Sequence, residues 1–134
     1  MNGLLYLYAE PECWQFREAY PDEWLSFGCG PGSLGDYLVP DSVLGLSVVE
    51  ACRIHDWYYR LWLEGETEED RATADRIGRN NALRIIDHAY EKGSNIWLTR
   101  IRRWLVQQAY LRVRKYGAAA FFEERNAKAY YREV

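Results

Sequence analysis

The pattern of apolar and polar positions along this chain is mostly helical, with no convincing alternation of the kind that indicates strands. Proline, capping residues and glycine divide the pattern into segments. Residues 26–37 hold four glycines and one proline, which predicts a loop, and residues 4–9 predict a buried strand or first turn. The pattern predicts helices over residues 12–20, 41–63, 67–92, 95–116 and 118–131. We therefore expect an all-α fold.

Several of these helices begin with a recognisable signal. Thr67 and Asp70 have the spacing of a capping box, with Asp in the place of the usual Glu. Pro11 suits a first helical position, and Gly93 and Gly117 are expected to end helices. The candidate N-caps of the helices over residues 41–63 and 95–116 are Asp41 or Ser42 and Ser94 or Asn95.

The chain length and composition indicate one compact domain. The 134 residues predict a single domain, with a site region at residues 27–86 and a basic helical extension at residues 95–134. A hydrophobic content of 49% and a charged content of 28% exclude a disordered chain. Aromatic residues reach 16%, so many rings are expected at a core edge or on a contact surface. No apolar run reaches the ~18 to 20 residues needed to cross a bilayer.

Charge and cysteine usage add two expectations. Residues 1–75 hold 15 acidic residues against four arginines, a balance of −11, whereas residues 76–134 hold 13 basic against five acidic residues, a balance of +8. Such halves either neutralise each other or meet a cation and a polyanion. Three cysteines allow one disulfide at most. No basic residue precedes the short apolar start, so we expect no signal peptide and a cytoplasmic or virion-associated protein.

The helix over residues 41–63 carries a polar stripe. At about 100° per residue, Cys52, His55, Asp56 and Tyr59 share one face, where an ordinary core-facing helix would have apolar side chains. If the next helix packs antiparallel, Asp75 reaches the imidazole of His55 and fixes its tautomer. The other reading makes Asp75 a surface acid paired with a nearby arginine, either Arg71 or Arg79. The reversed pair Asp87–His88 is expected on a solvated helix face.

These motifs, together with the loop Cys29-Gly30-x-Gly32, resemble the phospholipase A2 superfamily, in its bacterial and viral forms. The resemblance covers about residues 27–86 and implies calcium-dependent hydrolysis of the sn-2 ester of a glycerophospholipid. It implies that His55 is the general base, that Asp75 orients it, and that Tyr59 is hydrogen-bonded near Asp75. It also implies Ca²⁺ held by three loop carbonyls and one carboxylate, an oxyanion donor at the Gly30 amide, and a disulfide between Cys29 and Cys52. The implied calcium ligands are Gly28, Gly30, Gly32 and Asp56.

Such a site needs an apolar mouth for acyl chains. The candidates, each of which also suits a core position, are Leu4, Leu5, Trp24, Phe27, Trp57 and Trp62. The sequence departs from the family at residues 36–46, which read as an insertion, and at residues 95–134, which have no counterpart. The alternative function is a non-enzymatic interaction protein of phage or mobile-element type, which binds a protein partner through charged and aromatic surfaces.

The basic extension admits three partners. Residues 97–116 contain six basic residues and no acid, interleaved with aromatic and aliphatic residues. The segment can lie on an anionic phospholipid membrane, bind nucleic acid, which is the least favoured partner, or dock on the acidic half of the chain. Arg100, Arg103 and Arg114 fall within about one third of the helix circumference and are the predicted contacts to an anionic surface.

Overall fold

The computed structural model of the protein describes residues 6–28, 41–62 and 66–123. In these ranges the chain is largely helical, and a two-stranded antiparallel hairpin is the one exception to an all-α architecture. The elements, in chain order, are α1 (Pro11–Ala19), α2 (Pro21–Ser26), β1 (Ser42–Val43), β2 (Leu46–Ser47), α4 (Val49–Leu61), α5 (Glu68–Glu91), α6 (Ile96–Tyr116) and α7 (Ala118–Glu123).

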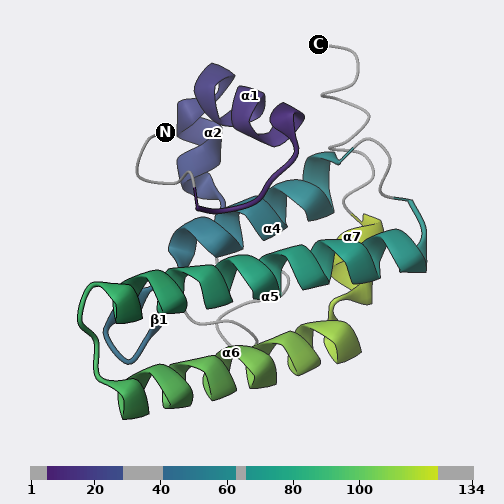
Figure 1. Ribbon diagram of the computed structural model, residues 1–134. Helices are drawn as coiled ribbons and strands as arrows, with labels where there is room; N and C mark the ends of the chain where they lie inside the picture. Colours follow the sequence, from purple (N-terminus) through teal and green to yellow (C-terminus); the bar gives the residue numbers. More distant parts are fainter. Residues whose placement is uncertain (1–5, 29–40, 63–65, 124–134) are drawn as a thin grey trace.

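Three long helices form successive layers, with α5 between α4 and α6 (Figure 1). Their chain directions alternate, so α4 and α5 are antiparallel, as are α5 and α6. The short helix α1 packs on α4, and α7 contacts all three long helices at one end of the layers. The predicted antiparallel pair is therefore the pair α4 and α5.

The helix predicted over residues 41–63 is wrong in its first part. Residues 42–47 form the β1–β2 hairpin, with Ser42 opposite Ser47 and Val43 opposite Leu46, and α4 begins only at Val49. The two turn residues, Leu44 and Gly45, have φ values of 49° and 82°. Two successive positive φ angles cannot continue a right-handed helix, and they match the twist of a two-residue hairpin turn.

Other predicted boundaries agree with the structure. The Thr67 side chain caps α5, and the Asp70 side chain accepts from the Thr67 backbone, as the capping box predicts. Asn95 caps α6 by accepting from the first turn. Pro21 begins the additional helix α2, which was not predicted. Of the helix predicted over residues 118–131, the structure describes α7, and residues 124–131 lie outside the described ranges.

The core is rich in rings. Trp24, Phe27, Trp57 and Trp62 are all buried, so these four predicted acyl contacts are core residues, whereas Leu4 and Leu5 lie outside the described ranges. Residues 6–9 form no strand. Instead, the Tyr8 backbone N–H and C=O pair with the Asn81 side-chain amide, each at 2.7 Å. Among the described residues, no helix is both long enough and apolar enough to cross a membrane.

Candidate functional site

The polar stripe of α4 faces the middle of α5. His55 Nε2 lies 2.7 Å from Asp75 Oδ1, and the Tyr59 hydroxyl donates to the same oxygen at 2.5 Å. His55 and Tyr59 are one helical turn apart, and their ring centroids are 4.3 Å apart. The Asp75 side chain is fully buried, whereas that of His55 is 13% exposed. The structure thus brings together the three residues for which catalytic roles were predicted.

The second oxygen of Asp75 faces two guanidinium groups. Arg114 Nη1 donates to Oδ2 at 2.6 Å, and Arg71 Nη1 donates to it at 3.5 Å. Burial alone would raise the pKa of the Asp75 carboxyl, but hydrogen bonds from His55, Tyr59 and Arg114 outweigh it and hold that pKa below its usual value. Asp75 is therefore a buried carboxylate that stays ionised at neutral pH.

Burial and the adjacent Asp75 carboxylate raise the pKa of the Tyr59 phenol above its usual value. Tyr59 therefore remains a protonated donor near neutral pH.

Arg71 joins this cluster to the end of α6. It makes two hydrogen bonds of 2.8 Å to the Glu68 carboxylate and donates to the backbone carbonyls of Val113 and Arg114 at 3.2 and 2.9 Å. Those carbonyls belong to the last turn of α6, and that of Val113 also accepts from the Gly117 N–H at 2.8 Å. Asp75 thus has the Arg71 partner of the surface-acid reading as well as His55, although it is buried. Arg79 instead stacks on the Tyr110 ring, 4.6 Å from its centroid.

Two glycines allow the helices to approach at this point. A Cβ at Gly78, inside α5, would lie 2.9 to 3.1 Å from side-chain atoms of His55. A Cβ at Gly117, which follows α6, would lie 2.8 Å from the Tyr59 hydroxyl and 2.6 Å from the Val113 carbonyl oxygen. At each position the nearest of these distances is below 3.0 Å, which is too short for a Cβ contact. Close packing, and not an unusual backbone angle, therefore favours glycine at positions 78 and 117.

The start of the predicted calcium loop lies beside Asp56. The Gly28 N–H donates to Asp56 Oδ2 at 3.2 Å, and Arg53 Nε donates to the Phe27 carbonyl at 3.2 Å. The Asp56 carboxylate is partly buried, with Arg60 Nε 3.9 Å away. Calcium prefers carboxylate and carbonyl oxygens, and Asp56 offers a carboxylate here, but the contact with Gly28 uses its N–H, so the calcium ligands stay a prediction.

The remaining loop positions, Cys29, Gly30 and Gly32, lie outside the described ranges. Within those ranges, no cluster of three or more His, Cys, Asp or Glu side chains has a metal-binding arrangement. A site built mainly from carbonyls needs no such cluster. Cys52 is disulfide-bonded and Cys13 is a free, buried thiol, while the predicted pairing with Cys29 stays a prediction.

The three predicted surface arginines have different environments. Arg114 is turned inward to Asp75 and to Glu68, at 2.7 Å from the latter, so it belongs to the site and not to an exposed surface. Arg103 is exposed and pairs with Asp87 at 2.5 Å. Arg100 is exposed and lies over the Trp97 ring, 5.1 Å from its centroid.

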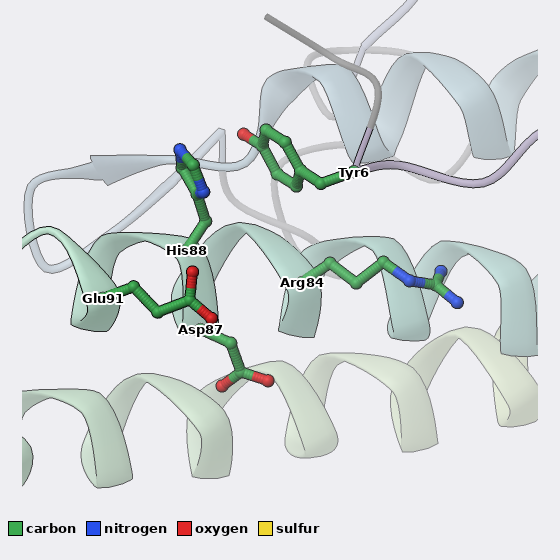
Figure 2. Close-up of a pocket in the computed structure, with 5 residues that line it drawn as sticks. All are labelled: Tyr6, Arg84, Asp87, His88 and Glu91. Atoms are coloured by element: carbon green, nitrogen blue, oxygen red, sulfur yellow. The ribbon is translucent and has the colours of Figure 1, made fainter.

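The second histidine has a different setting. His88 stacks on Tyr6 at 4.3 Å between centroids, beside a shallow pocket of about 260 Å³ that Arg84, Asp87 and Glu91 also line (Figure 2). Figure 2 shows His88 directed toward Tyr6, while the neighbouring Asp87 points away toward α6. His88 and Asp87 are neighbours in sequence but do not contact each other through these side chains, whereas His55 and Asp75 lie on different helices and form a hydrogen bond.

The sequence reasoning missed Arg114, Gly78 and Gly117 as parts of the site. A glycine inside a long helix was the one local signal available for Gly78. Comparisons of the chain with protein-family models, with curated proteins and with solved structures found no match.

Proposed function

We propose that the protein is a calcium-dependent, phospholipase A2-like hydrolase of the sn-2 ester of glycerophospholipids. The observation that carries this proposal is the largely buried imidazole of His55, bound through Nε2 to the buried, ionised Asp75. A histidine oriented by a carboxylate is an arrangement for general-base catalysis. With Nε2 engaged, Nδ1 is the nitrogen that accepts a proton from water.

In the proposed reaction, a water oxygen attacks the ester carbonyl carbon while its proton passes to His55 Nδ1. Asp75 stabilises the resulting imidazolium because it carries a full negative charge. When the tetrahedral intermediate collapses, the bond to the glycerol oxygen breaks and His55 returns the proton to that oxygen. The products are a lysophospholipid and a fatty acid.

Asp56 and the carbonyls of Gly28, Gly30 and Gly32 are the proposed calcium ligands, and the Gly30 amide is the proposed oxyanion donor. Bound calcium would supply positive charge to the developing oxyanion and to the lipid phosphate. Gly28 and Asp56 support this assignment because a hydrogen bond joins them, at the start of the loop.

Hydrolysis of a phospholipid with a fluorogenic sn-2 chain tests the proposal. We expect His55→Ala to reduce the rate at least about a hundredfold, since a general base typically contributes that much. His88→Ala is the matched control and should retain the wild-type rate, because His88 contacts Tyr6 and lies outside the site. Equal rates for wild type and both variants would contradict the enzyme reading and favour a non-enzymatic interaction protein.

Calcium binding is tested separately by thermal unfolding. A ligand that binds only the native state raises its stability, so calcium should raise the Tm of wild type and of His55→Ala. Asp56→Ala should abolish the increase, and Asp87→Ala, which removes an exposed carboxylate from α5, should preserve it. A Tm that does not respond to calcium in the wild-type protein would contradict the proposed metal site.

A further inference from the structure

The outer face of α6 carries large apolar side chains that are strongly exposed. Trp97 and Trp104 are 66% and 60% exposed, and Ile101 and Leu111 are 50% and 49% exposed. Their spacing of three, four and seven residues places them on one side of the helix. We call these four residues the α6 outer stripe. The side chains that α6 buries belong to its other side: Thr99, Arg102, Val106, Ala109 and Val113.

Positive charge surrounds the α6 outer stripe. Of the six basic residues between positions 97 and 116, Arg102 and Arg114 are turned inward to backbone carbonyls and carboxylates. The other four are exposed; the segment itself contains no acid, and Arg103 pairs with Asp87 of α5. Those exposed residues are Arg100, Arg103, Arg112 and Lys115.

Moving the apolar side chains of the α6 outer stripe out of water would be favourable, so their exposure indicates a binding surface. A second copy of the chain is disfavoured as the occupant, because it would bring like charges face to face. An anionic bilayer matches both features. Tryptophan rings settle at the headgroup level, and arginine and lysine side chains extend from there to lipid phosphates.

We propose that the α6 outer stripe is a membrane-binding surface, by which α6 lies in the plane of an anionic phospholipid bilayer. The helix is an end layer of the three, on the side of α5 away from α4 (Figure 1), so its outer face can lie against headgroups as that of an interfacial amphipathic helix does. This surface does not depend on His55 or on calcium, so it stands whether or not the site hydrolyses lipid.

Co-sedimentation of the full chain with vesicles tests the proposal, in EDTA to exclude hydrolysis and calcium bridging. Wild type should bind vesicles of phosphatidylglycerol and phosphatidylcholine much more tightly than phosphatidylcholine alone. Trp97→Ser with Trp104→Ser should weaken binding more than about tenfold. The matched control, Tyr8→Ser with Leu25→Ser, removes two exposed apolar side chains outside α6 and should bind like wild type.

Charge is tested with a second matched pair. Arg100→Glu should weaken binding roughly tenfold at low salt and much less at high salt, since each basic residue near an anionic surface contributes modestly and is screened. Arg76→Glu makes the same change of net charge at an exposed position of α5 and should have a far smaller effect.

Tryptophan quenching by brominated phosphatidylcholine in the anionic vesicles needs no variant of the protein. Wild-type fluorescence should be quenched on binding, because two of its six tryptophans would enter the headgroup region. The proposal is overturned if wild type fails to bind anionic vesicles, if no quenching accompanies binding, or if the control variants lose as much binding as the stripe variants. Tighter, Trp97-dependent binding to duplex DNA than to vesicles would also overturn it, in favour of nucleic acid.

Discussion

At the scale of single residues, Asp75 accepts hydrogen bonds from three helices with one buried carboxylate. Oδ1 is hydrogen-bonded to His55 and Tyr59 of α4. Oδ2 accepts from Arg71 of α5 and Arg114 of α6. A buried charge is costly unless its partners compensate for lost hydration, and here every donor points at one group. Asp75 is therefore a junction of the three long helices, at the centre of the proposed site.

Gly78 is the residue where this junction is tightest. Replacing a glycine inside a helix with alanine ordinarily stabilises it by about 0.5 to 1 kcal/mol. At position 78 the new Cβ would meet His55, with its nearest contact 2.9 Å away, and overpacking of this kind costs about 1 to 3 kcal/mol. We expect Gly78→Ala to lower the free energy of unfolding, measured by urea denaturation.

The control for Gly78→Ala is the same change in a His55→Ala background. There two of the three close contacts, those to the His55 ring atoms, are absent, so the cost should be smaller. An equal or larger cost in that background would show that the destabilisation does not come from the His55 ring.

At the scale of elements, the predictable parts of the fold are those with signals close in sequence. The capping box at Thr67 and the cap at Asn95 specify where α5 and α6 begin, and their lengths follow from helical periodicity. The β1–β2 hairpin was not predicted because Leu44 has a positive φ, and leucine is not a residue type that indicates such an angle. The local sequence favours a continuous helix, but the tertiary contact of Arg102 with the hairpin outweighs that preference.

The same reasoning explains the partial success at the site. Helical spacing relates His55 to Tyr59, and an antiparallel neighbour relates both to Asp75, so this group follows from the sequence. Arg114 lies 39 residues beyond Asp75 on a third helix, and its inward direction depends on how α6 packs. That packing is a tertiary property without a local sequence signal.

The contact that holds the hairpin comes from Arg102. Its buried guanidinium donates to the backbone carbonyls of Val43 and Leu44 at 3.1 and 2.8 Å. Arg102→Met should lower the free energy of unfolding by about 1 to 3 kcal/mol, because the acceptor in buried Val43 would lose this donor, whereas Leu44 is 51% exposed and its carbonyl can bind water. Chemical denaturation measures the change.

Arg100→Met is the matched control for Arg102→Met, since Arg100 is exposed on the same helix and lies over a ring. It should change stability by less than about 0.5 kcal/mol. If the two variants were equally stable, the hairpin would not depend on the guanidinium of Arg102.

At the scale of the whole molecule, the acidic and basic halves of the chain meet at the site. Arg114 of the basic half contacts Asp75 and Glu68 of the acidic half, with distances of 2.6 and 2.7 Å. Neutralisation is nevertheless partial, because Arg103 pairs within its own half and Arg100 faces solvent over Trp97. The basic extension is thus divided between an inward structural end and an outward charged face.

The ion pair of Asp75 with Arg114, which joins the two halves, predicts how the free energy of unfolding depends on pH. The pKa of Asp75 is lower in the folded protein than in the unfolded chain, where a value of about 3.9 is usual. Its ionised form therefore stabilises the fold fully above that value, and this contribution is lost as the pH falls through the lower folded-state pKa. The free energy of unfolding, from urea denaturation at pH values from about 7 to about 2, should drop at the acidic end.

Arg114→Met isolates the part of this pH dependence that comes from joining the two halves. Without the Arg114 donor, the pKa of Asp75 should lie closer to its usual value, so the variant is less stable near pH 7 but loses less stability on acidification. Arg100→Met, which removes an equal charge from the exposed face, should keep the wild-type pH profile. If Arg114→Met and wild type lost equal stability between pH 7 and pH 2, Arg114 would not stabilise the ionised form of Asp75. The two halves would then be joined through α5 packing rather than through this charge contact.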